Sequence, residues 1–405
     1  MLTSLALIFL VGLGMAGVCQ KIKLPRIIGM LATGIILGPY VLGWLDDSIL
    51  SISSDLRQMA LIIILLKAGL SLNLADLKKV GRPAVMMACV PASCEILAFI
   101  LFAPYILNIT RIEAAVMGAV LAAVSPAVVI PRMVSLMENG YGTKKSIPQM
   151  IMAGASCDDI FVIVLFSTFS GMAQGEQVHL MDFVNIPISI ILGVVLGVIV
   201  GFLLSMFFET AYAHKHCIRN SMKVIIVLGM AFLLMAIETW VKPYVSVSGL
   251  LAVVSMACVI KIKCIPSVSA RLSEKFGKLW IAAEVILFVL VGAAVDIRYT
   301  LNAGLAAVLM IFVALIFRAI GVCICMLGTA LTPKERLFCV IAYLPKATVQ
   351  AAIGSVPLAM GLACGQIVLS VAVLGILITA PLGAIGMDLT YRQLLEKTSD
   401  EDNIG

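Results

Sequence analysis

The chain has 405 residues, of which 62% are hydrophobic and only 12% are charged, and its mean hydropathy is +1.14. A water-soluble domain would carry about a quarter charged residues, so the composition excludes an ordinary soluble protein. The net charge of +6 does not indicate binding to nucleic acid, because the basic residues are spread over short loops. The composition predicts an all-α polytopic membrane protein whose first partner is the lipid bilayer.

Apolar stretches of about 17–25 residues recur along the chain, each long enough to cross a bilayer core of about 30 Å. Backbone polar groups in lipid must be satisfied within the segment, so these stretches are predicted to be helices. The first is expected to be retained rather than cleaved as a signal peptide, because no Lys or Arg precedes it. We predict thirteen spans, at residues 2–19, 27–45, 56–72, 83–107, 113–137, 147–171, 184–208, 222–240, 245–262, 279–296, 302–329, 336–360 and 365–388.

Charges in successive loops alternate in sign. The basic set comprises Lys21, Lys23, Arg26, Lys78, Lys79, Arg82, Arg132, Lys144, Lys145, Lys215, Arg219, Lys223, Lys261, Lys263, Arg271, Lys275, Lys278, Lys334 and Arg336. The opposite set holds only Arg57, Arg111, Lys242 and Arg298, with acids such as Asp46, Asp47, Glu176 and Asp182. Basic loops face the cytoplasm, so the N-terminus is expected outside and the C-terminus inside, in the plasma membrane. An odd number of spans agrees with that topology.

The two halves of the chain contain similar short segments, separated by about 220 residues. GMLA at 29–32 resembles GLLA at 249–252, and Pro126 in the fifth span corresponds to Pro345 in the twelfth. Because the first and eighth spans would enter from opposite sides, the repeats would be inverted, an architecture of transporters with the ion site at the midplane. We therefore predict one transporter unit over 1–405, with repeats at about 1–171 and 222–388 and a linking helix at about 184–208.

Asp158 and Asp159 lie in the middle of the sixth predicted span, in the sequence GASCDDI. Ionisable residues at bilayer depth are costly, so they are functional candidates by default. Two neighbouring carboxylates in an apolar helix can hardly both be ionised without a cation, because desolvation and mutual repulsion oppose it. A carboxylate that holds either a proton or a metal ion is the minimum requirement of an antiporter. The alternative is a structural pair bonded to neighbouring helices.

Prolines interrupt the fifth and twelfth spans. Pro126 frees a backbone carbonyl, and such carbonyls and the Ser125 hydroxyl are hard oxygen ligands suited to an alkali cation. A simple kink is the alternative. In the twelfth span Lys346 follows Pro345, and a lysine there can neutralise the negative C-terminal ends of half-helices. It could instead pair with Asp158 or snorkel to the interface.

Glu95 and Arg318 occupy equivalent helices of the two predicted repeats, the fourth and the eleventh spans. Opposite charges in lipid find partners, so we predict that these two residues pair. A purely structural ion pair fits the sequence as well as a role in transport does. Lys67 and Glu284 also lie in apolar spans, and the sequence assigns them no role.

Four segments together resemble a known family. They are LKAGL at 66–70, VSPAVVIP at 124–131, GASCDD at 154–159 and LPKATVQAA at 344–352. The chain resembles the monovalent cation/proton antiporters of the two-aspartate Nha type over nearly its whole length. The resemblance implies the sodium/proton antiporter fold, with crossed broken helices, a dimerisation domain and a mobile core domain. It also implies elevator-like alternating access, a homodimer, and no cofactor besides the transported H⁺ and Na⁺ or Li⁺.

The resemblance also implies residue roles. Asp159 looks like the main carrier of cation and proton, with Asp158 as its partner in holding Na⁺ or Li⁺ and Ser125 as a further ligand. Thr348 belongs with Pro345 and Lys346 to the second broken helix. The pair Glu95–Arg318 corresponds to a family ion pair. If this pair replaces the lysine–aspartate pair of electrogenic relatives, each cycle exchanges one cation for one proton.

Other functions remain open on the same scaffold. These are a potassium/proton antiporter, a sodium-coupled solute symporter and a cation channel. An intramembrane aspartyl protease needs two carboxylates that face each other from different helices, whereas Asp158 and Asp159 are adjacent on one helix. The sequence therefore predicts no catalytic residue and no enzyme.

Overall fold

The computed structural model describes residues 1–22, 24–71, 81–174, 180–213, 219–241, 245 and 247–397. In these residues all regular structure is helical, apart from one isolated bridge between Tyr141 and Lys397. The helices are α1 (Leu2–Lys21), α2 (Arg26–Leu37), α3 (Asp47–Leu50), α4 (Ser53–Ser71), α6 (Arg82–Leu107), α7 (Arg111–Ala122), α8 (Pro126–Glu138), α9 (Ile147–Ala173), α10 (Leu180–Ala213), α11 (Asn220–Val241), α12 (Gly249–Lys263), α13 (Pro266–Ala293), α14 (Ile297–Cys325), α15 (Pro333–Ala342), α16 (Thr348–Ile353), α17 (Val356–Ala359) and α18 (Gly365–Leu394).

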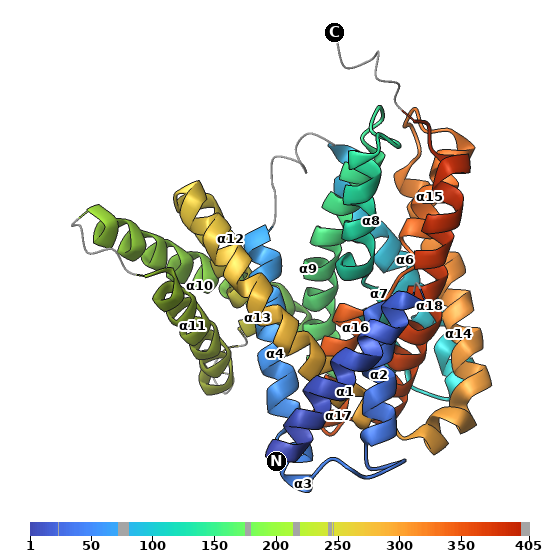
Figure 1. Cartoon of the computed structure of the whole chain (residues 1–405), viewed down its shortest axis with the longest axis horizontal. Coiled ribbons are helices and arrows are strands. Elements are labelled where there is room, and N and C mark those ends of the chain that lie inside the picture. Colours follow the sequence, from blue (N-terminus) through green and yellow to red (C-terminus); the bar gives the residue numbers. More distant parts are fainter. Residues whose placement is uncertain are drawn as a thin grey trace. The chain divides into compact units, whose positions relative to one another are not determined.

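The chain divides into two compact units. Unit 1 comprises Met1–Ser54, Asn73–Val162 and Phe288–Gly405, and unit 2 comprises Asp55–Leu72 and Ile163–Leu287. Within unit 1, α6 packs against α7 and α14, and α18 packs against α14 and α15 (Figure 1). Within unit 2, α12 packs against α10 and α11. The start of α1 and the C-terminal end of α18 lie at opposite ends of unit 1 (Figure 1).

The helix boundaries agree with most of the predicted spans. Nine helices of the described residues are long and apolar enough to cross a membrane, and the count of thirteen spans stays a prediction. Some of the loop charges that predict the orientation lie outside the described residues, namely Lys23, Lys78, Lys79, Glu176, Lys215 and Lys242.

Two boundaries differ from the prediction for physical reasons. The second span was expected to reach residue 45, but α2 ends at Leu37, because Gly38 is extended and precedes a proline. The tenth was expected to begin at 279, but α13 begins at Pro266. Its first turns are charged yet amphipathic, since Leu272 and Phe276 on one face are fully buried.

Two helices of unit 1 are broken, and they share one design. The first consists of α7 and α8, and the second of α15 followed by α16 and α17. Each begins with the same capping box, in which Thr110 pairs with Glu113 and Thr332 with Glu335. The two capping boxes lie about 220 residues apart. The similar sequence segments in the two halves of the chain are separated by the same offset.

The second half of α8 and the loop after it form hydrogen bonds with the C-terminal part of α18 and the residues after it. Arg132 donates to both carboxylate oxygens of Asp388, at 3.0 Å each. The backbone N–H of Gly142 donates to the carbonyl of Glu396 at 2.8 Å. The half-helix α8, which begins at Pro126, is therefore held by charge-assisted hydrogen bonds at its middle and by a backbone hydrogen bond just beyond its end.

Candidate functional site

The two broken helices meet where each is unwound. Residues 123–125 separate α7 from α8, and residues 343–347 separate α15 from α16. The backbone N–H of Ser125 donates to the carbonyl of Pro345 at 2.8 Å. Pro126 occupies the first position of α8, where its missing N–H is not needed. The predicted interruptions thus lie side by side and are hydrogen-bonded to each other.

The last carbonyls of α7 accept hydrogen bonds from side chains of other helices. Lys346 Nζ donates to the carbonyl of Leu121, and Arg318 Nη1 donates to that of Ala122. The carbonyl of Ala123 accepts from Gln350 Nε2 at 2.7 Å. These carbonyls have no partner within their own helix and carry its partial negative charge. Two cationic side chains and an amide therefore donate to the unpaired carbonyls at the end of α7. Neutralising the end of a half-helix is the role that the sequence suggests for Lys346.

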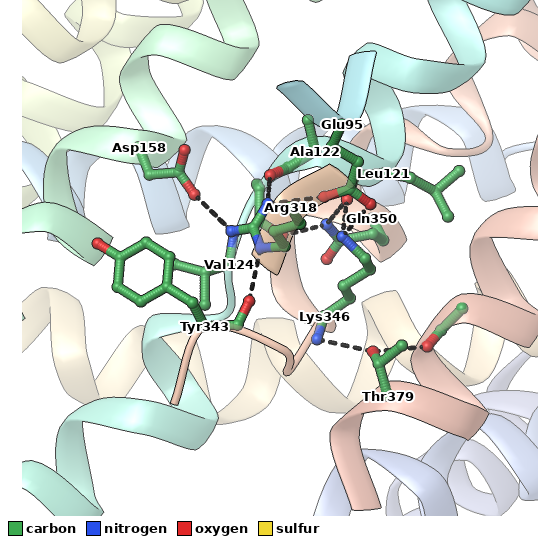
Figure 2. A network of polar contacts seen from close by, with 12 residues as sticks. Glu95, Leu121, Ala122, Val124, Asp158, Arg318, Tyr343, Lys346, Gln350 and Thr379 are labelled. Carbon is green, nitrogen blue, oxygen red and sulfur yellow. Dashed lines mark hydrogen bonds and ion pairs between the residues drawn. The ribbon is translucent and has the colours of Figure 1, made fainter. Parts of the chain in front are cut away.

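A network of buried ion pairs surrounds this helix end. Arg318 Nη1 lies 2.7 Å from Glu95 Oε2, and Lys346 Nζ lies 2.6 Å from Glu95 Oε1. Arg318 Nη2 also lies 3.3 Å from Asp158 Oδ2, and Figure 2 shows the guanidinium between the two carboxylates. None of the four side chains is more than 1% exposed. Two carboxylates and two cations balance, which is the condition for burying such charges.

The two adjacent aspartates have different surroundings. Asp158 is completely buried, and its Oδ2 accepts from the backbone N–H of Val124 at 2.7 Å in addition to its pair with Arg318. Asp159 is 7% exposed, and no hydrogen bond or ion pair to it occurs in the part of the chain that the structure describes. The network next to Asp159 is already neutral, so an ionised Asp159 would give this region a net negative charge.

Several buried oxygens near the crossing have no hydrogen-bond partner among the described residues. They are Ser125 Oγ, Thr348 Oγ1, Gln350 Oε1, Asp158 Oδ1 and Asp159 Oδ1. Buried polar atoms are nearly always paired in native proteins, so unpaired ones mark a place where a ligand or water binds. Hydroxyl, amide and carboxylate oxygens are the hard ligands that an alkali cation accepts. Asp159, together with these unpaired oxygens, is the candidate cation site.

The structure separates alternatives that the sequence left open. Lys346 does not pair with Asp158; its carboxylate partner is Glu95. Its backbone N–H donates to Thr379 Oγ1 at 3.0 Å, a contact that the sequence analysis missed. Thr379 and Gln350 could have been singled out as polar residues in otherwise apolar helices. Lys67 lies in unit 2, over the ring of Trp280, and takes no part in this network.

Comparison with known proteins gives consistent matches. The model of a family described as "Sodium/hydrogen exchanger, transmembrane" matches residues 5–389. Sodium/hydrogen exchanger 9B2 of Homo sapiens is 33% identical over 392 residues, covering 94% of this chain and 71% of that protein. Sodium/hydrogen exchanger 9B1 of Mus musculus is 30% identical over 422 residues, covering 93% and 67%.

A solved structure shares the fold. The sodium proton antiporter MjNhaP1 from Methanocaldococcus jannaschii, determined at pH 8, superposes with a TM-score of 0.82 at 20% identity. The superposition covers 96% of this chain and 97% of that one. With its helical architecture, its two crossed broken helices and a family match over nearly its whole length, the chain belongs to the sodium/hydrogen exchanger family.

Proposed function

We propose that this chain exchanges Na⁺ for H⁺ across a membrane by alternating access, with Asp159 carrying either ion in turn. The observation that carries the proposal is the contrast between the two aspartates. Asp158 is tied to Arg318 and to a backbone N–H, whereas Asp159 has no cationic partner among the described residues. A buried carboxylate without a fixed counter-charge needs a mobile one, and H⁺ and Na⁺ compete for it. Li⁺ fits the same hard oxygen ligands.

The charge balance supports an exchange of one cation for one proton. The network of Glu95, Asp158, Arg318 and Lys346 is neutral by itself. With either H⁺ or Na⁺ on Asp159, the whole site is neutral too. With neither ion, a bare charge would have to cross the bilayer, which desolvation opposes. Both loaded forms therefore cross with the same charge, and the empty form does not.

The arrangement of the chain supports the remaining parts of the proposal. The whole charge network lies in unit 1, which we assign as the mobile core, and unit 2 contributes to the dimerisation domain of a homodimer. The start of α1 and the end of α18 lie at opposite ends of unit 1, in line with an outside N-terminus and a cytoplasmic C-terminus in the plasma membrane.

The test is sodium uptake driven by a proton gradient in proteoliposomes. Asp159→Asn should abolish uptake, while Asp55→Asn, which removes an exposed carboxylate at the start of α4, should leave it close to wild type. Uptake at several clamped membrane potentials should be equal if no net charge moves. Unchanged exchange by Asp159→Asn would overturn the assignment of the carrier. A rate that follows the potential would overturn the one-to-one exchange, and uptake of K⁺ in place of Na⁺ would favour the potassium antiporter.

A further inference from the structure

Tyr343 stands at the end of α15, where the second broken helix unwinds. Its side chain is completely buried. Its carbonyl accepts a hydrogen bond from Arg318 Nε, and the guanidinium carbon lies 5.5 Å from the centre of its ring. Arg318 thus holds both the backbone and the ring of this tyrosine, in the same network that holds Asp158 (Figure 2). The position of the phenol is fixed by the ion pairs beside it.

The hydroxyl of Tyr343 lies directly against α9. A Cβ atom on Gly154 would be only 2.1 Å from the hydroxyl oxygen, so only a glycine leaves room for it. Gly154 precedes Asp158 by four residues, and residues at this spacing lie one above the other on the same helix face, about 5–6 Å apart. The hydroxyl therefore lies against the face of α9 that carries Asp158, one helical turn before that residue.

Two unpaired polar atoms meet on this face. The hydroxyl of Tyr343 and Asp158 Oδ1 are both buried, and neither has a hydrogen-bond partner among the described residues. One is a donor and the other an acceptor. A single water, with two hydrogen bonds of about 2.8 Å, can connect two such groups where they lie too far apart for a direct hydrogen bond. Buried waters typically bind such otherwise unsatisfied groups.

We propose that Tyr343 is a positioning residue, whose hydroxyl donates through one bridging water to Asp158 Oδ1. Arg318 and the N–H of Val124 already hold the other carboxylate oxygen. The water-mediated bond fixes the rotation of the carboxylate, and so orients Asp158 toward a cation at Asp159. The inference rests on the proposed function, since it concerns the affinity of that cation site.

The deciding variant is Tyr343→Phe, which removes one oxygen and keeps the buried ring. Losing one bridging hydrogen bond of ordinary strength should weaken Na⁺ binding about fivefold. The KM for Na⁺ in proteoliposomes should rise by that factor, and the maximal rate should stay within about twofold of wild type. The same factor should appear in detergent, in the Na⁺ concentration that half-saturates thermal stabilisation. Tyr105→Phe, at a tyrosine that is 79% exposed, is the matched control and should change neither value.

A merely structural hydroxyl gives a different result. Removing it would leave the KM unchanged and raise the melting temperature, because an unpaired buried group disappears. That result would overturn the proposal, as would a lower maximal rate with an unchanged KM. Thermal stabilisation by Na⁺ does not require transport, so a wild type that binds Na⁺ without exchanging it would contradict the proposed function alone.

A second variant tests the contact itself. Gly154→Ala places a methyl group where the hydroxyl lies, and should raise the KM about as much as Tyr343→Phe does. Combining the two should raise it no further, since both remove the same bond. If the two factors multiply in the double variant, the hydroxyl does not act through this contact and the proposal is wrong.

Discussion

The two broken helices have the same order of parts, but they contribute different hydrogen-bonding groups to the site. At its interruption the first contributes backbone, namely the carbonyls of Leu121, Ala122 and Ala123. The second contributes the donors Lys346 and Gln350 that bind two of these three carbonyls. Both begin with the same capping box, so their main difference in chemistry lies at the interruptions. The first broken helix supplies most of the acceptors at the crossing and the second most of the donors, while the N–H of Ser125 donates in the other direction, to the carbonyl of Pro345.

The largest expected effect comes from removing the carboxylate that holds both cations. Glu95→Gln leaves Arg318 and Lys346 buried with one fewer negative charge, and breaking a buried ion pair in this way costs about 3–5 kcal/mol. The free energy of unfolding, measured in mixed micelles, should fall by that amount. Glu95→Gln combined with Lys346→Gln should cost less than the sum of the single changes, because the network regains its balance. Strict additivity would show that the two residues are not coupled.

The donor role of the second broken helix is tested by Gln350→Leu. The change leaves the carbonyl of Ala123 buried without its 2.7 Å hydrogen bond, which should cost about 1–3 kcal/mol in the free energy of unfolding. Gln58→Leu, at an exposed glutamine of α4, is the control and should cost much less. Equal losses would mean that the carbonyl finds another donor and that the complementarity of the two helices is only geometric.

A smaller effect is expected where α18 supports the second interruption. Thr379 Oγ1 accepts from the N–H of Lys346 and donates to the carbonyl of Gly375, so Thr379→Val should cost about 1 kcal/mol. Thr390→Val is a matched control on the same helix, because Thr390 makes the same bond to Gly386 without accepting one from the broken helix. A melting temperature lowered equally by both changes would rule out a special role for Thr379.

The smallest expected effect is the difference in stability loss between variants of the two capping boxes. Losing a capping threonine costs about 0.5–2 kcal/mol. Thr332→Ala should fall in the upper part of that range, because Glu335 of its box is only 2% exposed and also binds Lys145. Thr110→Ala should fall in the lower part, since its box is exposed. A greater loss of thermal stability in Thr110→Ala would contradict this ranking.

Much of the fold could be predicted from the sequence, because lipid allows few solutions for an apolar segment. Pro126 and Pro345 marked both interruptions, since a proline cannot donate within a helix. The extension of α13 was missed, because its charged first turns resemble a loop when hydropathy alone is considered. The early end of α2 at Gly38 was missed because the residues that follow it remain apolar.

The site could be predicted as a set of residues but not as a set of partners. The free-energy cost of placing a charged side chain in lipid was enough to single out Glu95, Asp158, Asp159, Arg318 and Lys346. Which carboxylate faces which cation depends on how each helix is rotated about its own axis. These rotations cannot be predicted from a single sequence. The pairing of Lys346 with Glu95 and the separate environments of the two aspartates therefore emerged only from the structure.

The hydrogen bond from Ser125 to Pro345 has a mechanical consequence. Pulling the unwound segments apart would leave a buried N–H and a buried carbonyl without their partners, at a cost of about 1–3 kcal/mol. In the proposed transport cycle, this bond favours movement of the crossing half-helices together over their separation from each other. A covalent link between the two unwound segments should therefore leave the proposed exchange unchanged.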